Sequence, residues 1–279
     1  MSITVHQRPG VYSSYDASMV VSGSGSGRLV GLAAINTVAQ AGQAQTITSY
    51  DKAVAAFGSA GGEDMAELIR LILKNGASGV VAVPVDDESG YEAAFELLSG
   101  MEDLALVLCD STQESVQQKL KESVMSASEL RRERLGVVAG GSGESVEELT
   151  ARAKNLNCER MILVAPGCVD QQGESLTGLS LAAAVAGAIA GESDPAIPLG
   201  GAQLLGLYGL SQRYEDNELD LLILGGVTPV EQVGGTVSVV RGVTTRTMSG
   251  ESADSTWRDR KSTRLNSSHS RASRMPSSA

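Results

Sequence analysis

One stretch of the sequence, residues 133–191, constrains the fold more than any other. Two short apolar runs rich in Val, Leu and Ile, Leu135–Ala139 and Met161–Ala165, alternate there with two segments of helical period. This strand–helix–strand–helix order is typical of a parallel α/β layer in which helices cover both faces of the sheet. The sequence therefore predicts an α/β fold with a mainly parallel sheet.

The flanking sequence continues the alternation and predicts two units. A small α/β subdomain is expected over residues 28–100, and a larger central α/β domain over residues 101–245. The segment 220–224 fits a helix or a strand, and the acidic residues beside its leucines favour a helix. We expect strands at 28–35, 46–49, 78–85, 104–109 and 236–240, and helices at 49–58, 63–75, 89–98, 112–128, 145–157 and 179–190.

Residues 1–27 read as an N-terminal arm and flexible linker. The segment begins with a β-branched run that contains Ile3, Thr4, Val5 and His6, and it ends in the linker SGSGSG at 22–27. A strand so near the terminus either joins its own sheet or adds to the edge of a neighbour's sheet. The residues alone favour neither.

Residues 246–258 read as the start of a further, C-terminal domain, and the character of the sequence then changes at Asp259. Residues 259–279 are rich in Ser and Arg and show no periodicity. The translation of a common short-read sequencing adapter reads DRKSTRLNSSH, which is the sequence of 259–269. We therefore interpret 259–279 as disordered adapter read-through and exclude it from the fold. The rest of the chain holds 17 basic and 32 acidic residues, a net charge of −15.

Composition argues against several classes of partner. A net charge of −11 and an aromatic content of 3% disfavour nucleic acid, which binds basic surfaces and aromatic platforms. The longest apolar run is shorter than the roughly 20 residues that cross a bilayer, so we expect no membrane insertion. The three cysteines, Cys109, Cys158 and Cys168, lack metal-ligand spacing and are expected to be buried thiols of a cytosolic protein.

One glycine-rich turn, residues 139–144, suggests a nucleotide-binding site because it lies between a predicted strand and a helix. The third glycine of a G-x-G-x-x-G pattern, however, falls on Val146. Glu144, Glu147 and Glu148 also place negative charge where a phosphate would bind. We therefore expect a plain tight turn and no cofactor, and keep a Rossmann-like nucleotide-binding enzyme as the alternative.

No other group of residues predicts catalysis. His6 is the only histidine before residue 259, so a histidine metal site is excluded and a Ser-His-Asp triad would have to use His6. The carboxylates of Asp86, Asp87 and Glu88 lie before a predicted helix, where capping explains them. We expect no catalytic and no metal-binding residues, and no enzyme activity.

Several short motifs are spread over residues 3–258. They are RPGVY at 8–12, Asn157 with Glu159-Arg160 and LVAPG at 163–167, LAAAVAG at 181–187, DPAIPL at 194–199, Glu218-Leu219-Asp220 with GGVT at 225–228, and VVRGVTT at 239–245. In this order they resemble the motifs of contractile phage tail sheath proteins. The middle domain of that family has a topology described as subtilisin-like, which the predicted elements share, although this chain lacks a protease triad.

The resemblance implies a structural subunit of a phage or R-type bacteriocin tail. Such subunits form hexameric rings stacked helically around a tail tube protein, between a baseplate and a tail terminator, and contract to drive the tube through an envelope. They are assembled in the host cytoplasm and reside in the virion tail. The family's arms add strands to neighbouring subunits, so Ile3, Thr4, Val5 and His6 would form the arm strand. Family members continue beyond the position of Arg258, so the resemblance also implies a missing C-terminal domain. A self-assembling protein unrelated to tails remains a third hypothesis.

Overall fold

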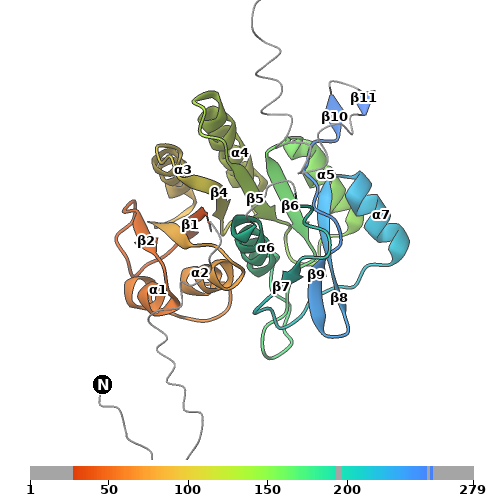
Figure 1. Cartoon of the computed structure of the whole chain (residues 1–279), viewed down its shortest axis with the longest axis horizontal. Coiled ribbons are helices and arrows are strands. Elements are labelled where there is room, and N and C mark those ends of the chain that lie inside the picture. The colour runs from red at the N-terminus through yellow and green to blue at the C-terminus, as the bar shows by residue number, and fades with distance from the viewer. Residues whose placement is uncertain (1–27, 193–196, 250–251, 254–279) are drawn as a thin grey trace, which may run out of the picture.

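Parallel strands form the centre of the molecule. A computed structural model describes residues 28–192, 197–249 and 252–253. Its main sheet has nine strands in the order β2-β3-β1-β4-β5-β6-β8-β9-β7, and it runs across the molecule in Figure 1. The strands from β3 to β8 in this order pair in parallel, whereas β2, β9 and β7 are antiparallel to their neighbours. The α/β fold with a mainly parallel sheet is thus confirmed.

The elements have the following bounds. The strands are β1 (Leu29–Ile35), β2 (Gln45–Ile47), β3 (Gly79–Val85), β4 (Leu104–Cys109), β5 (Leu135–Ala139), β6 (Met161–Ala165), β7 (Gln203–Leu204), β8 (Val227–Val233) and β9 (Thr236–Val239), with a separate hairpin of β10 (Met248–Ser249) and β11 (Ser252–Ala253). The helices are α1 (Tyr50–Phe57), α2 (Met65–Lys74), the 3-10 turn η2 (Glu88–Gly90), α3 (Tyr91–Ser99), α4 (Glu114–Glu129), α5 (Val146–Leu156), α6 (Leu179–Gly191) and α7 (Asp216–Leu224).

Helices cover both faces of the sheet, which explains why its central strands are apolar throughout. Alternate residues of one strand enter different cores. Leu108 of β4 belongs to the core that contains residues of α1, α2 and α6, and Val107 belongs to the core that contains residues of α3, α4, α5 and α7. Every residue of β3, β4, β5 and β6 is buried. Side chains that lose contact with water on both faces supply the main stabilisation of such a layer.

Helix α6 is buried on all sides and lies across the middle of the sheet in Figure 1. Its small residues allow a close approach to α2, since a Cβ added to Gly187 would lie 2.3 Å from the Ile72 carbonyl oxygen. The sequence predicted this internal helix over 179–190 from its apolar, alanine-rich composition. The structure extends it by one residue.

Element boundaries follow the predictions closely in the centre of the sheet. The bounds of β4, β5 and β6 agree with the predicted runs, and the ambiguous segment at 220–224 is helical, as part of α7. The strand expected at 46–49 is shorter and ends at Ile47, because Ser49 is the N-cap of α1.

Strand β8 is not among the elements predicted from the sequence, and it contains a proline, a residue that is rare inside central strands. Pro229 forms the last pair of β8 with β6, opposite Ala165. Beyond that pair β8 continues with β9 on its other side. The missing amide hydrogen of Pro229 therefore falls where the parallel pairing ends.

The predicted division at residue 100 does not interrupt the sheet. Strand β1 pairs with β3 on one side and with β4 on the other, so strands from both predicted units lie in one layer. The two-unit division stays a prediction. The predicted arm and linker at 1–27 and the predicted adapter segment at 259–279 lie outside the described residues.

Candidate functional site

The glycine-rich turn between β5 and α5 is closed by its own side chains. A Cβ added to Gly140 would lie 2.5 Å from a methyl carbon of Leu149. Ser145 caps α5 by accepting the Glu148 amide at 3.3 Å, and Glu148 accepts the Ser145 amide at 2.8 Å in return. This capping box satisfies backbone donors that a phosphate would need.

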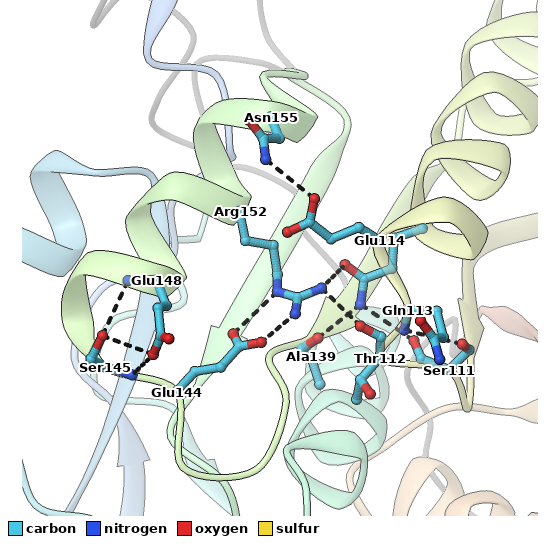
Figure 2. Close-up of polar contacts among 11 residues, drawn as sticks. Ser111, Thr112, Gln113, Glu114, Ala139, Glu144, Ser145, Glu148, Arg152 and Asn155 are labelled. Atoms are coloured by element: carbon cyan, nitrogen blue, oxygen red, sulfur yellow. Dashed lines mark hydrogen bonds and ion pairs between the residues drawn. The ribbon is translucent and has the colours of Figure 1, made fainter.

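Arg152 of α5 occupies the space beside the turn, as Figure 2 shows. Its guanidinium forms a two-pronged ion pair with Glu144 and donates to the Thr112 carbonyl at 2.8 Å. It also donates to the Gln117 side chain at 3.3 Å, and Gln117 donates to the Ala139 carbonyl at 2.8 Å. Arg152 is 9% exposed and Gln117 is fully buried. The cluster therefore ties α5 to the loop after β4 and to the end of β5.

The space that remains above the turn is too small for a nucleotide. A cavity of about 10 Å³ lies between Gly140, Glu144, Gly167 and Tyr214, which is room for a single water molecule. Ligand pockets for small molecules usually measure hundreds of cubic ångströms. The turn was the only support for a nucleotide-binding enzyme, and its geometry gives that alternative no support.

The predicted arm-strand residues, Ile3, Thr4, Val5 and His6, lie outside the described residues, so their role stays a prediction. Within the described ranges, no helix is both long and apolar enough to span a bilayer. No group of three or more His, Cys, Asp or Glu residues in the same ranges is arranged to hold a metal ion.

The three predicted buried thiols are confirmed. Cys109, Cys158 and Cys168 are free and buried, and burial raises their pKa values to about 12, 11 and 12. Nearly all of each thiol is protonated at neutral pH. Such groups make poor nucleophiles.

Three of the motifs that carry the family resemblance, those at 157–160, 225–228 and 239–245, meet at the opposite end of the sheet, around the segment 243–248. Asn157 ends α5 with a left-handed φ of 37°. Its side-chain oxygen accepts the amides of Thr247 at 3.1 Å and Met248 at 3.0 Å, and its side-chain nitrogen donates to the Met248 carbonyl at 3.1 Å. One side chain thus binds the backbone of a segment about 90 residues away in sequence.

Two buried threonines fix the same segment. The Thr245 hydroxyl accepts the Cys158 amide and donates to the Cys158 carbonyl, both at 3.1 Å, and the Thr245 amide donates to the Met161 carbonyl at 2.9 Å. The Thr228 hydroxyl likewise accepts the Val243 amide and donates to the Val243 carbonyl, both at 3.0 Å. We call Asn157, Thr228 and Thr245, with the backbone groups that they bind, the threonine clamp.

Ion pairs surround the threonine clamp. Arg246 pairs with Glu159 at 3.1 Å, and Arg160 pairs with Glu133 at 2.5 Å. Because the side chains of both pairs are partly exposed, each pair contributes less than the buried hydroxyl bonds. The clamp fastens the chain after β9 to the start of β6 and can transmit force between these segments. It presents no reactive group to a substrate.

Comparison with known proteins agrees with this geometry. The chain is 31% identical over 149 residues to the tail sheath protein of Bacillus phage SP01, a match that spans 51% of this chain and 26% of the relative's length. Among solved structures, it resembles a sheath tail protein from Desulfitobacterium hafniense with a TM-score of 0.69 and 13% identity, covering 92% of this chain and 80% of that one.

A second solved structure is the helical sheath of the anti-feeding prophage in its contracted state. Its TM-score is 0.66 at 19% identity, and the match covers 99% of this chain and 79% of that one. At these identities the structural matches show the shared fold. The model of the phage tail sheath protein central domain matches residues 87–245. Because this match covers more than half of the sequence, the chain belongs to the phage tail sheath protein family.

Proposed function

We propose that the protein is a structural subunit that polymerises into a contractile sheath around a tail tube. Contraction of this sheath drives the tube through the envelope of a target cell. The observation that carries the proposal is the family match over 87–245, and three of the motifs within it, at 157–160, 225–228 and 239–245, form the threonine clamp. A subunit that transmits force needs a firm connection between its fold and the segments that link it to neighbours.

The assembly would consist of hexameric rings stacked helically. One similar structure is a helical sheath in a contracted state, and another belongs to a baseplate. On this basis the partners are further copies of the chain, a tail tube protein, a baseplate and a tail terminator. The subunits would assemble in the cytoplasm of the host bacterium and reside in the virion tail.

Linkage between subunits would use backbone pairing. Ile3, Thr4, Val5 and His6 would add a strand to a neighbour's sheet, and 22–27 would act as the flexible connection. Ladder hydrogen bonds hold copies together while side-chain contacts between rings are exchanged. Contraction is then a switch between two packings of the same subunit.

Negative-stain microscopy tests the proposal. The gene is expressed from its source genome with whatever coding sequence follows Arg258, alone and together with the tube protein. We expect rings or tubes, with the tube protein inside them, whereas the chain ending at Arg258 should form no ordered tubes. Monomers in every preparation would contradict the proposal.

A thermal-shift assay separates the proposal from the nucleotide-binding alternative. We expect dinucleotides at millimolar concentration to leave the melting temperature of the chain unchanged, because Glu144 and Leu149 fill the turn. A stabilisation of several degrees that is lost in the Gly141→Val variant would support an enzyme instead.

A further inference from the structure

A cleft at the carboxyl end of the sheet combines an apolar lining with unpaired carboxylates. It measures about 250 Å³ and lies between the segment 210–216, the start of α7 and the outer half of β8. Leu210, Leu219 and Val230 supply its apolar lining. Three carboxylates, Glu215, Asp216 and Glu231, line it together with one basic residue, Arg213, so acidic side chains are in excess. Neither Asp216 nor Glu231 has a side-chain hydrogen bond or ion pair within the described ranges. We call this the acidic cleft.

One buried polar group of the acidic cleft indicates a ligand. Tyr214 lies between the cleft and the cavity of about 10 Å³ above the glycine turn and lines both; it is 6% exposed, and its hydroxyl has no hydrogen-bond partner among the described residues. A buried hydroxyl without a partner costs free energy unless another group completes it. Burial raises the pKa of Tyr214 to about 12, with Glu218 and Glu144 adding to the shift, so the hydroxyl keeps its proton. Carboxylates together with a neutral hydroxyl suit a cation with several N–H donors, which is the chemistry of a guanidinium.

The chain itself presents such a group at the end of α4, in the sequence Leu-Arg-Arg-Glu-Arg at 130–134, which we call the basic tip. Leu130 is 67% exposed. Arg132 contacts Glu102 at 3.7 Å, and Arg134 is buried against the carbonyls of Leu98 and Met101. Arg131 is exposed and has no side-chain partner in the part of the chain that the structure describes.

The backbone conformation of Arg131 is unusual for a non-glycine residue just after the end of a helix. Its φ of 65° is left-handed, a conformation that helix ends normally give to glycine. The Arg131 amide bonds to the Ser128 carbonyl at 2.9 Å, and the Arg132 amide bonds to the Ala127 carbonyl at 2.9 Å. An arginine at this position projects its side chain from the helix end at the cost of a strained backbone.

The acidic cleft and the basic tip lie at opposite ends of the sheet. The basic tip directly precedes β5 and therefore lies at the amino ends of the parallel strands. The acidic cleft contains the carboxyl half of β8, which is parallel to β6. A contact between these two surfaces is head-to-tail and leaves one unused surface at each end, so it propagates into an open array.

We infer that the acidic cleft of one subunit accepts Leu130 and Arg131 from the basic tip of a second copy. The inference rests on the proposed self-assembly and names one of its contacts. Leu130 would pack on the apolar lining, while the Arg131 guanidinium would bind Glu231 and Asp216. In a chain of strongly negative charge, an exposed arginine with no partner of its own is well suited to meet an acidic surface.

Disulfide trapping tests the contact even if it is weak. The Arg131→Cys variant is mixed with the Glu231→Cys variant under mild oxidation, and the three native thiols are buried and do not interfere. A matched control mixes Arg131→Cys with Val38→Cys, because Val38 is 68% exposed and lies outside the acidic cleft. We expect about tenfold more mixed dimer in the first mixture. Equal yields in the two mixtures would overturn the inference.

Charge exchange provides a second measurement. By sedimentation velocity at low salt, Arg131→Glu and Glu231→Arg should each weaken self-association by about tenfold. The variant with both changes should associate like the parent, since each new charge meets its complement. Failure of the double variant to recover would count against the pairing. If tubes form in the microscopy experiment but Arg131→Cys and Glu231→Cys do not cross-link, only this contact is refuted. If the two variants cross-link but no tubes form, only the proposed sheath function is refuted.

Discussion

At the scale of single residues, the threonine clamp concentrates the most specific contacts of the structure. The Thr245 hydroxyl satisfies both backbone groups of Cys158 in a buried environment. An apolar group of similar shape cannot replace this hydroxyl without cost, because the Cys158 amide would remain buried without a partner and the Cys158 carbonyl would keep only the Met161 amide.

The Thr245→Val substitution should lower the free energy of unfolding by about 2 kcal/mol, since it leaves the buried Cys158 amide without a partner and removes one of the two hydrogen bonds to the Cys158 carbonyl. Urea denaturation measures the change. Thr236→Val is the matched control, because Thr236 is exposed at the start of β9, and it should change stability by less than about 0.5 kcal/mol. Equal effects of the two substitutions would show that the clamp contributes nothing.

The buried carboxyl group of Asp110 predicts how the stability of the protein depends on pH. Its carboxylate accepts hydrogen bonds from the Tyr91 hydroxyl and from the Ile35 amide, the latter at 2.8 Å. Burial raises the pKa of Asp110 above its ordinary value of 3.8, and the hydrogen bonds offset part of this rise. The folded protein therefore holds this proton more tightly than the unfolded chain does. The contribution of Asp110 to stability is most favourable below about pH 4 and declines as pH rises through the raised pKa.

The Asp110→Asn variant lacks this titration. Relative to the parent, its free energy of unfolding should rise between about pH 4 and pH 7, because only the parent loses stability as Asp110 ionises. Replacing the carboxyl group by an amide also changes the hydrogen bonds at this position. This change adds a pH-independent amount to the difference in free energy of unfolding between variant and parent. Urea denaturation across the pH range measures it, and a constant difference between variant and parent would contradict the account.

At the scale of elements, helix α6 depends on close backbone packing. A methyl group on Gly187 would overlap the Ile72 carbonyl, so Gly187→Ala should force α6 away from α2 and destabilise the protein by about 1–3 kcal/mol. Gly100→Ala is the control, since its added carbon would lie at an ordinary 3.4 Å from the Leu97 carbonyl. Thermal unfolding of both variants measures the effect. A neutral Gly187→Ala variant would mean that α2 and α6 pack less tightly than described.

The elements also show how far the sequence could predict the fold. The bounds of β5 and β6 followed from uniform apolar runs between polar segments, because a strand buried on both faces has no other composition. Strand β8 was not among the predicted elements, and its pairing shows that the parallel contact with β6 ends at Pro229.

The site residues were less predictable than the elements. The tight glycine turn was foreseen from the carboxylates beside it, but Arg152 was not, since an arginine on a helix usually faces solvent. In the threonine clamp, Asn157 and Thr245 join residues 87 to 91 positions apart, and Thr228 joins a residue 15 positions away. Periodicity within a single helix or strand does not indicate such contacts. The motifs within it were recognised as a family resemblance without any sign that they touch.

At the scale of the whole molecule, the described polar contacts serve mainly to hold the fold together. Its glycine turn is filled, its thiols are buried and protonated, and its most elaborate polar contacts hold one part of the chain to another. The two ends of the sheet differ in chemistry, with the basic tip at one end and the acidic cleft at the other. A subunit with unlike ends suits a polymer that grows by repetition.

The most direct test of this account is a helical reconstruction by electron cryo-microscopy of particles formed by the chain with its natural continuation. We expect six-fold rings in which every subunit contains the fold of residues 28–249, with the threonine clamp intact. Isolated monomers or closed dimers with no helical lattice would contradict the claim that this chain is a sheath subunit.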